Sequence, residues 1–254
     1  MAALQQKDIR VALESLGVCR GESICVHSFS GAFGHFEGGL KTIADGLLDA
    51  VGPQGNLIVP TYNYDFFRGV PYDPDRSPSQ VGQLSEYCRS QLNFRRTFHP
   101  VYSHAILGPY AEDFLANPST SGFGEGSDFW KMHQAGIKLI YFGIAMNSGG
   151  TFLHYVEETA GVPYRFVKDF PGQVLKSGQM ASFTAQIYSR RLDLKPEPVS
   201  NLRPFQADLL ANRKARLTEL GRGEILVVSA ENFFQRACEK IKEDPFYFLE
   251  AVPR

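Results

Sequence analysis

The sequence lacks any apolar run approaching the roughly 18 residues that a membrane-spanning helix needs, so we expect no transmembrane segment and no membrane partner. Its first residues, Met1–Lys7, are polar, and no secretory signal is predicted. Only four cysteines occur, and they are scattered, without the close pair that is typical of a zinc site. A reduced, cytoplasmic location is therefore the expectation.

The sequence also lacks an excess of either charge. Its 26 Lys and Arg residues nearly balance 27 Asp and Glu residues, which argues against a nucleic-acid partner. With 43% hydrophobic residues, 24 glycines and 15 prolines, the composition is typical of a globular chain and excludes collagen-like or mostly disordered ones. The length of 254 residues is enough to bury a sizeable core.

Several well-known catalytic and binding motifs are missing. There is no G-x-S-x-G motif, which argues against a standard α/β-hydrolase, and no G-x-x-x-x-G-K-[ST] phosphate-binding loop. The segment Gly122–Gly126 (GFGEG) has the wrong spacing for a dinucleotide-binding fingerprint. No H-E-x-x-H motif occurs, and we expect no metal site.

Strand-like and helix-like stretches alternate along the chain. A strand at 23–27, a helix at 40–51 and a strand at 56–64 make a βαβ-like unit. Pro60 predicts that the end of the second strand is an edge or a bulge. The other expected helices cover 6–16, 80–92, 204–220, a stretch capped by Ser127 that ends at 134, one beginning at 151, and one capped by Ser229 that ends at 242; the other expected strands cover 101–108, 137–143, 180–194 and 224–228. We therefore predict α/β architecture: a single domain over residues 1–254 with a mixed central β-sheet flanked by helices.

The strongest chemical signal is the segment 149–158, GGTFLHYVEE, which follows a buried strand. Ligands of α/β proteins bind at such strand ends. Thr151 is the expected N-cap, which puts His154 in the first turn with Glu157 and Glu158 on its face. The helix terminus and a carboxylate act oppositely on the imidazole, so we expect a pKa near neutrality, as suits a general base. A purely structural hydrogen-bonded pair is the alternative.

Six short segments between residues 21 and 164 are similar, in order and separation, to the motifs of one known family. They are Val26–Gly34 (VHSFSGAFG) followed by Gly38-Gly39, Gly52–Thr61 (GPQGNLIVPT), Asp73–Ser79 (DPDRSPS) with Gly82 and Leu84, His99–Ser103 (HPVYS), Gly124–Ser127 (GEGS), and Leu153-His154 with Glu157. On these segments the chain resembles the aminoglycoside 3-N-acetyltransferase family, also called the antibiotic N-acetyltransferase family. The resemblance implies that family's fold and the transfer of an acetyl group from acetyl-CoA, the cosubstrate, to a small-molecule amine.

The resemblance also implies roles for individual residues. His154 would be the general base, with Glu157 as its acid partner, in a direct transfer that needs neither a metal nor a covalent intermediate. The loop after the first strand and the D-P-x-x-S-P segment would bind coenzyme A. The residues implied are Ser28, Phe29, Ser30, Gly31, Phe33 and Gly34 in the loop, and Arg76 and Ser77 in the segment. Backbone N–H groups of that loop are candidate oxyanion donors. The alternative is that the glycines only shape a turn and that Arg76 is a solvated charge.

Substrate contacts are expected from Tyr64, His99 and Ser103, although hydrogen-bonded core roles are equally open for His99 and Ser103. Two departures from the family pattern bear on the acceptor. Tyr102 replaces the second histidine of H-P-T-H-S, and Ser148-Gly149-Gly150 replaces an acidic D-S-N. Because polycationic aminoglycosides call for an acidic cleft and this chain has no acidic run, an amino-sugar nucleotide of surface-polysaccharide biosynthesis is an alternative acceptor.

Two other functions remain open at this stage. One is a non-catalytic protein that binds coenzyme A or a sugar, and the other is a hydrolase in which His154 activates water against a bound thioester. The sequence is compatible with a homodimer and does not require one.

Overall fold

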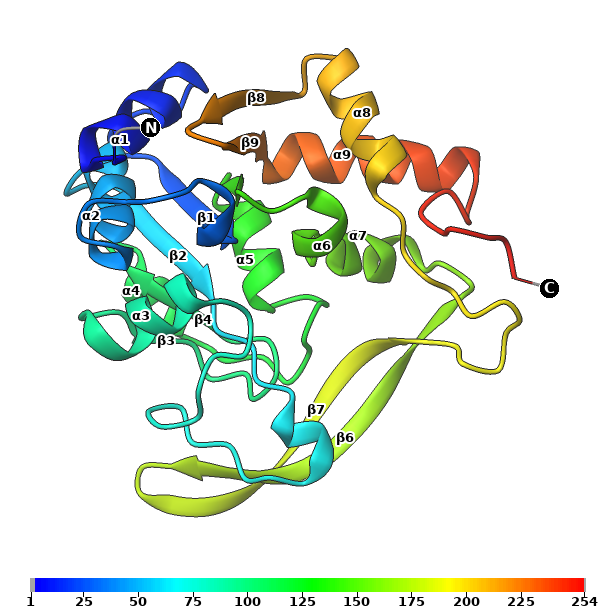
Figure 1. The fold of residues 1–254 in the computed structure, drawn as a ribbon. Coiled ribbons are helices and arrows are strands. Elements are labelled where there is room, and N and C mark those ends of the chain that lie inside the picture. The colour runs from blue at the N-terminus through cyan, green and yellow to red at the C-terminus, as the bar shows by residue number, and fades with distance from the viewer. Residues whose placement is uncertain (1–2, 254) are drawn as a thin grey trace.

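A seven-stranded mixed sheet forms the centre of the computed structural model, which describes residues 3–253 (Figure 1). In spatial order its strands are β3 (Arg95–Arg96), β4 (His104–Leu107), β2 (Asn56–Pro60), β1 (Ser23–Ser28), β5 (Lys138–Phe142), β9 (Gly223–Ser229) and β8 (Ala215–Leu220). The three central strands β2, β1 and β5 are parallel, and the outer ones pair antiparallel. The mixed central sheet expected from the sequence is therefore confirmed.

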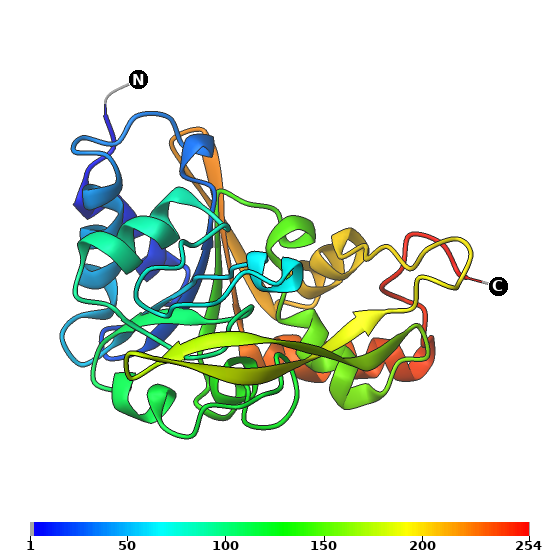
Figure 2. The same cartoon turned by 90° about the horizontal axis from the view of Figure 1, so that it is seen from below.

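Helices cover both faces of this sheet. The helices are α1 (Gln6–Ser15), α2 (Leu40–Val51), α3 (Gln83–Gln91), α4 (Ala111–Leu115), α5 (Asp128–Gln134), α6 (Met146–Gly149), α7 (Leu153–Ala160), α8 (Arg203–Ala211) and α9 (Ala230–Glu243), with short 3₁₀ turns η1 (Ser30–Ala32) and η2 (Asp65–Arg68). Figure 2 shows the sheet nearly edge-on between the two helical layers. Within residues 3–253 no helix combines the length and the apolar character needed to cross a bilayer.

The central strands are buried on both sides because their alternate residues enter two different cores. In β1, Ile24 and Val26 pack with residues of α1, α2 and α3, whereas Cys25 points to the core formed with α5, α7 and α9. In β5, Ile140 and Leu139 divide in the same way. The apolar runs ICV in β1 and LIYF in β5 follow from this double burial, and the parallel pairing brings the carboxyl ends of the three strands to one edge of the sheet.

A long β-hairpin lies outside the main sheet. Its strands, β6 (Arg165–Lys176) and β7 (Gln179–Arg190), pair with each other over their whole length and form a separate ribbon (Figures 1 and 2). Backbone hydrogen bonds tie it to two loops: Tyr72 N donates to Gln173 O (2.9 Å), and Gly122 N donates to Gln186 O (2.8 Å). The hairpin is thereby held against the loop that follows β2 and the loop between α4 and α5.

Most local expectations are confirmed, including α2 at its predicted bounds and the two serine caps. The Ser127 hydroxyl accepts the Trp130 N–H, and that of Ser229 accepts the Asn232 N–H, as N-caps do. Strand β2 lies inside the sheet, but its end at Pro60 pairs only with β4, in agreement with the edge expected there. The ladder between β1 and β2 stops at Cys25 and Ile58, so the N–H that proline lacks is not needed there.

The chain from 204 to 220 is not one helix. Helix α8 ends at Ala211, Arg213 adopts a positive φ of 56°, and β8 then begins at Ala215. The alternating sequence ARLTEL pairs with β9 through a tight turn at Gly221. Strand β6 was missed, and the predicted antiparallel strands at 180–194 correspond to β7 alone, which pairs with β6.

Candidate active site

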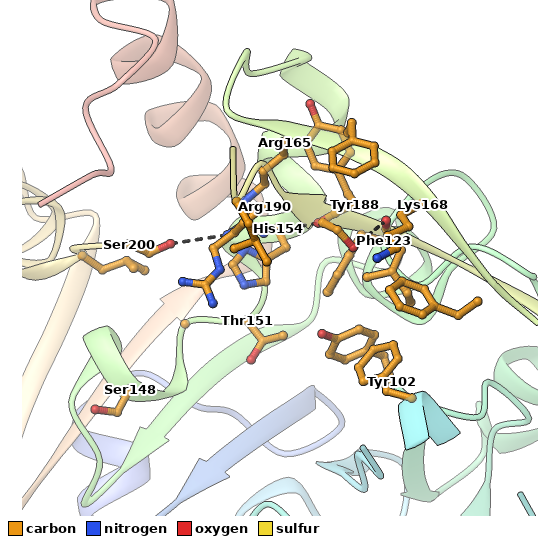
Figure 3. A pocket seen from close by; sticks show the side chains of 18 of the residues that line it. Tyr102, Phe123, Ser148, Thr151, His154, Arg165, Lys168, Tyr188, Arg190 and Ser200 are labelled. Atoms are coloured by element: carbon orange, nitrogen blue, oxygen red, sulfur yellow. Dashed lines mark hydrogen bonds between the residues drawn. The ribbon is translucent and has the colours of Figure 1, made fainter. Parts of the chain in front are cut away.

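Two adjoining cavities lie where the parallel strands end. The larger, here called the main cleft, has a volume of about 820 Å³ and lies between the turn that joins α6 to α7 and the β6–β7 hairpin (Figure 3). The smaller, here called the strand-end pocket, has a volume of about 570 Å³ and opens at the carboxyl ends of β1, β2 and β5. Ser148 and Thr151 line both cavities, so a ligand that fills one can reach the other. This is the edge at which α/β proteins bind ligands.

His154 lines the main cleft from the first turn of α7. Its Nδ1 lies 2.7 Å from Glu157 Oε2, and its side chain is 23% exposed, at the wall of the cleft. Among residues 3–253 nothing hydrogen-bonds its Nε2, and Figure 3 shows the ring facing the cavity. The imidazole is therefore oriented by a carboxylate on one side and open to a ligand on the other.

Glu157 is completely buried and has three partners. Besides His154, its carboxylate accepts the Tyr164 hydroxyl (2.9 Å) and makes an ion pair with Arg165 Nε (2.7 Å). A buried carboxylate is stable only when it is paired and hydrogen-bonded in this way. Burial opposes the charged form, but Arg165 and His154 outweigh it and hold the pKa of Glu157 below its usual value. The carboxylate therefore stays ionised at neutral pH.

The pKa of His154 is lower than the sequence suggested. Burial is the largest cause, Arg165 and Arg190 add to it, and the hydrogen bond to Glu157 offsets only part of the effect. The expectation from the sequence weighed the carboxylate against the helix terminus and did not include burial or the two cations. A neutral imidazole, whose Nε2 lone pair can accept a proton, is the form present at pH 7.

Two details of α7 differ from expectation. Thr151 is not the N-cap: the helix starts at Leu153 after a turn in which His154 N donates to Thr151 O (3.0 Å). The Glu158 carboxyl does not contact His154, although the i, i+4 spacing would allow it; only Glu157 is hydrogen-bonded to the ring. The Glu158 carboxyl turns to the loop at Gly124, where burial raises its pKa to about 7.

The strand-end pocket contains part of the set expected to bind coenzyme A. Ser28 and Phe29 line it, as does Tyr64, which was expected to contact the acceptor. The Phe29 side chain is 60% exposed at the pocket mouth. Ser30 and Gly31 form η1 directly after these residues, and Gly34 follows with a positive φ of 103°. The loop thus lies beside the pocket with only its first residues in the wall.

The remaining residues of that set lie elsewhere. The Phe33 ring packs in the core, with its centroid 4.2 Å from that of the Phe142 ring, so its side chain is not available to a ligand. Arg76 is 90% exposed and lies 3.9 Å from Asp73, while Ser77 Oγ accepts the Asp73 N–H. Neither Arg76 nor Ser77 lines the main cleft or the strand-end pocket.

His99 and Ser103 have core roles. His99 Nδ1 accepts the backbone N–H groups of Val101 and Tyr102, and burial lowers the pKa of His99 to about 4. Ser103 is buried and hydrogen-bonded within a polar cluster that includes Thr61. Neither His99 nor Ser103 lines the main cleft or the strand-end pocket; in the H-P-V-Y-S segment it is Tyr102, the departure from the family pattern, that lines the main cleft.

The hairpin contributes a wall of the main cleft that the sequence did not indicate. Its lining residues include Arg165, Phe166, Lys168, Tyr188 and Arg190. The sequence did not identify these residues as part of a site, because β6 was not recognised as a strand. Among residues 3–253 no cluster of three or more His, Cys, Asp or Glu side chains is arranged to hold a metal ion.

Comparison with known proteins agrees with this geometry. A family model described as aminoglycoside 3-N-acetyltransferase matches residues 25–242. Aminoglycoside N(3)-acetyltransferase III of Salmonella sp is 30% identical over 211 residues, which cover 72% of this chain and 71% of that protein. The aminoglycoside N(3')-acetyltransferase-like protein YokD of Bacillus subtilis (strain 168) is 24% identical over 197 residues, covering 68% and 71%.

Solved structures share the fold over nearly the whole chain. AAC-IIIb in a binary complex with CoASH superposes with a TM-score of 0.85 at 23% sequence identity, covering 99% of this chain and 100% of that one. AAC-VIa bound to sisomicin superposes with a TM-score of 0.84 at 21% identity, covering 95% and 98%. The likeness extends to the β6–β7 hairpin and beyond, where the sequence motifs had ended.

Proposed function

The chain belongs to the aminoglycoside 3-N-acetyltransferase family, a family of CoA-dependent N-acetyltransferases, and from this premise we propose that it transfers an acetyl group from acetyl-CoA directly to an amino group of an aminoglycoside or amino sugar, with His154 as general base. One observation carries the proposal: His154 lies 2.7 Å from the buried Glu157 at the wall of a cleft that joins a second pocket.

The chemistry requires a base beside the acceptor nitrogen. An alkylamine is mostly ammonium at pH 7 and attacks a thioester only as the free base. As the C–N bond forms, the nitrogen becomes more acidic, so even an imidazole of lowered pKa takes its proton. Glu157 keeps the Nδ1 proton on the ring and stabilises the imidazolium that results. The C–S bond then breaks, and the leaving thiolate takes the proton from the His154 imidazolium, which gives the thiol and returns the ring to its neutral form.

The strand-end pocket fits the pantetheine arm of the cosubstrate. Its wall joins Ser28 and Phe29, after β1, to Ser148 and Thr151, which also border the main cleft beside His154. A chain lying in this pocket would present its thioester at the shared wall. Backbone N–H groups of the loop after β1 are then the candidate donors to the oxyanion of the tetrahedral intermediate.

A free-thiol assay with acetyl-CoA and a panel of aminoglycosides, amino sugars and simple amines tests the reaction class. Thiol release that depends on an amine, with formation of the N-acetyl product, is the expected result. Release without an amine would instead identify a thioester hydrolase. Binding of coenzyme A without release would identify a non-catalytic protein.

The role of His154 is tested by His154→Ala, which should lower the amine-dependent rate at least about 100-fold because the proton acceptor is lost. His35→Ala is the matched control, since His35 is exposed and lines neither cavity. Circular dichroism should show both variants folded. A His154→Ala variant as active as His35→Ala would remove His154 from the mechanism.

A further inference from the structure

The charged residues of the main cleft are mostly basic. Its wall contains Arg165, Lys168 and Arg190 but a single carboxylate, Asp193. That carboxylate is 64% exposed and already makes a 2.8 Å ion pair with Arg191. A polycationic acceptor would thus meet like charges in this cleft, where an acidic wall would be needed to hold it.

Two of the three cations are free to bind a ligand. Arg165 is buried and committed to Glu157, at 2.7 Å, and to the carbonyl of Tyr188, at 3.2 Å. Lys168 and Arg190 are exposed, and within residues 3–253 neither pairs with a carboxylate. Two unpaired cations that line a cavity form a site for an anion, with the guanidinium able to bind a phosphate group in bidentate fashion.

One of the two free cations, Arg190, lies near the base. Arg190 is the register partner of Arg165, which contacts the same carboxylate as His154. Figure 3 shows the Arg190 side chain close to that of His154, and Arg190 is one of the charges that lower the pKa of His154. Lys168 lies three residues after Arg165 on β6, which at the rise of a β-strand is about 10 Å along the hairpin. An anion bound along this line would hold an amino group of the same molecule against His154.

The rest of the wall is aromatic. Tyr102, Phe123, Phe170 and Tyr188 line the cleft, together with Phe166, which is 45% exposed. Aromatic faces of this kind stack on the apolar faces of sugar rings and on nucleobases. The wall therefore offers contacts for the uncharged part of an acceptor as well as for its anion.

We propose, resting on the acetyl transfer proposed above, that the acceptor is an amino sugar bearing a phosphate group, which Arg190 and Lys168 bind while the amino group lies at His154 Nε2. The shared chemistry is the phosphate, which either a sugar phosphate or a nucleotide-linked sugar supplies. A sugar phosphate would use the cations alone, and a nucleotide-linked sugar would also use the aromatic wall.

The test compares matched acceptors in the thiol-release assay: glucosamine, glucosamine 1-phosphate, UDP-glucosamine and a polycationic aminoglycoside. We expect kcat/KM to be at least about tenfold higher for a phosphorylated acceptor than for glucosamine, and the advantage to shrink as salt is added. UDP-glucosamine exceeding glucosamine 1-phosphate would identify the nucleotide-linked class. Preference for the aminoglycoside would overturn this inference while leaving acetyl transfer intact, whereas no activity with any amine would overturn both.

Variants separate the acceptor's phosphate from those of coenzyme A. Arg190→Gln and Lys168→Gln should each raise KM for the phosphorylated acceptor about tenfold and leave KM for acetyl-CoA within about twofold. Lys176→Gln, on the same strand but outside both cavities, is the matched control. A rise in KM for acetyl-CoA in place of the acceptor would show that these cations bind the coenzyme and would refute the inference.

Discussion

The two walls of the main cleft are built differently. The wall that carries His154 belongs to a helix anchored in the core, and the partner that orients it, Glu157, is fully buried. The opposite wall is an exposed hairpin, whose cations Lys168 and Arg190 are unpaired within residues 3–253. A reaction needs fixed distances, which burial provides, whereas choice among acceptors depends on exposed groups that a ligand can contact. We infer that the helix wall performs the chemistry and the hairpin wall selects the acceptor.

The largest expected difference between the walls is in stability. Glu157→Ala leaves Arg165 as a buried cation without its carboxylate, and should lower the free energy of unfolding by about 3–5 kcal/mol. Lys168→Ala removes an exposed side chain and should change it by no more than about 0.5 kcal/mol. Urea unfolding of the two variants measures this. Equal losses would show that the hairpin wall is as integral to the fold as the helix wall.

A smaller effect should appear in the titration of His154, where the two walls meet. NMR of labelled histidine, with the signal assigned by its loss in His154→Ala, should give a pKa below the ordinary 6.5. Because Arg190 disfavours the imidazolium, Arg190→Gln should raise this pKa toward the ordinary value. Lys176→Gln should leave it unchanged. A wild-type pKa above 6.5 would contradict the electrostatic account of the site.

The smallest effect concerns Glu158, one residue beyond Glu157 but turned away from the cleft. Its pKa is raised to about 7 in the folded chain, so its protonated form contributes stability below pH 4, and this contribution is lost as the pH rises through 7. Glu158→Gln imitates the protonated acid. The melting temperature of the variant relative to wild type should therefore be higher at pH 8 than at pH 5. The same difference at both values would show that the carboxyl is solvated.

The helix wall was largely predictable from the sequence, and the hairpin wall was not. A glycine turn followed by His154 and, three residues on, Glu157 specifies their contact through helical geometry alone. Arg165 and Arg190 lie 25 residues apart in the chain and meet only through the register of β6 and β7. No local pattern encodes that register, so the second influence on the pKa of His154 was missed.

Motif similarity located segments better than it located side chains. The loop after β1 does lie beside a pocket, yet Phe33 packs in the core, and His99 and Ser103 are buried and do not line the cleft. Short motifs fix the neighbourhood of a residue, whereas the direction of its side chain depends on packing. Strand β8 was not predicted, because the chain leaves α8 at Arg213 through a positive φ. No glycine or proline marks that break in the sequence.

The most direct test of the central claim is chemical rescue of His154→Ala. Because the imidazole of His154 is partly exposed at the cleft wall, its removal opens a space that free imidazole can enter. The account predicts that amine-dependent thiol release, slow in the variant, rises with added imidazole and that wild type does not respond. A variant that keeps the wild-type rate without imidazole would contradict the assignment of His154 as the base.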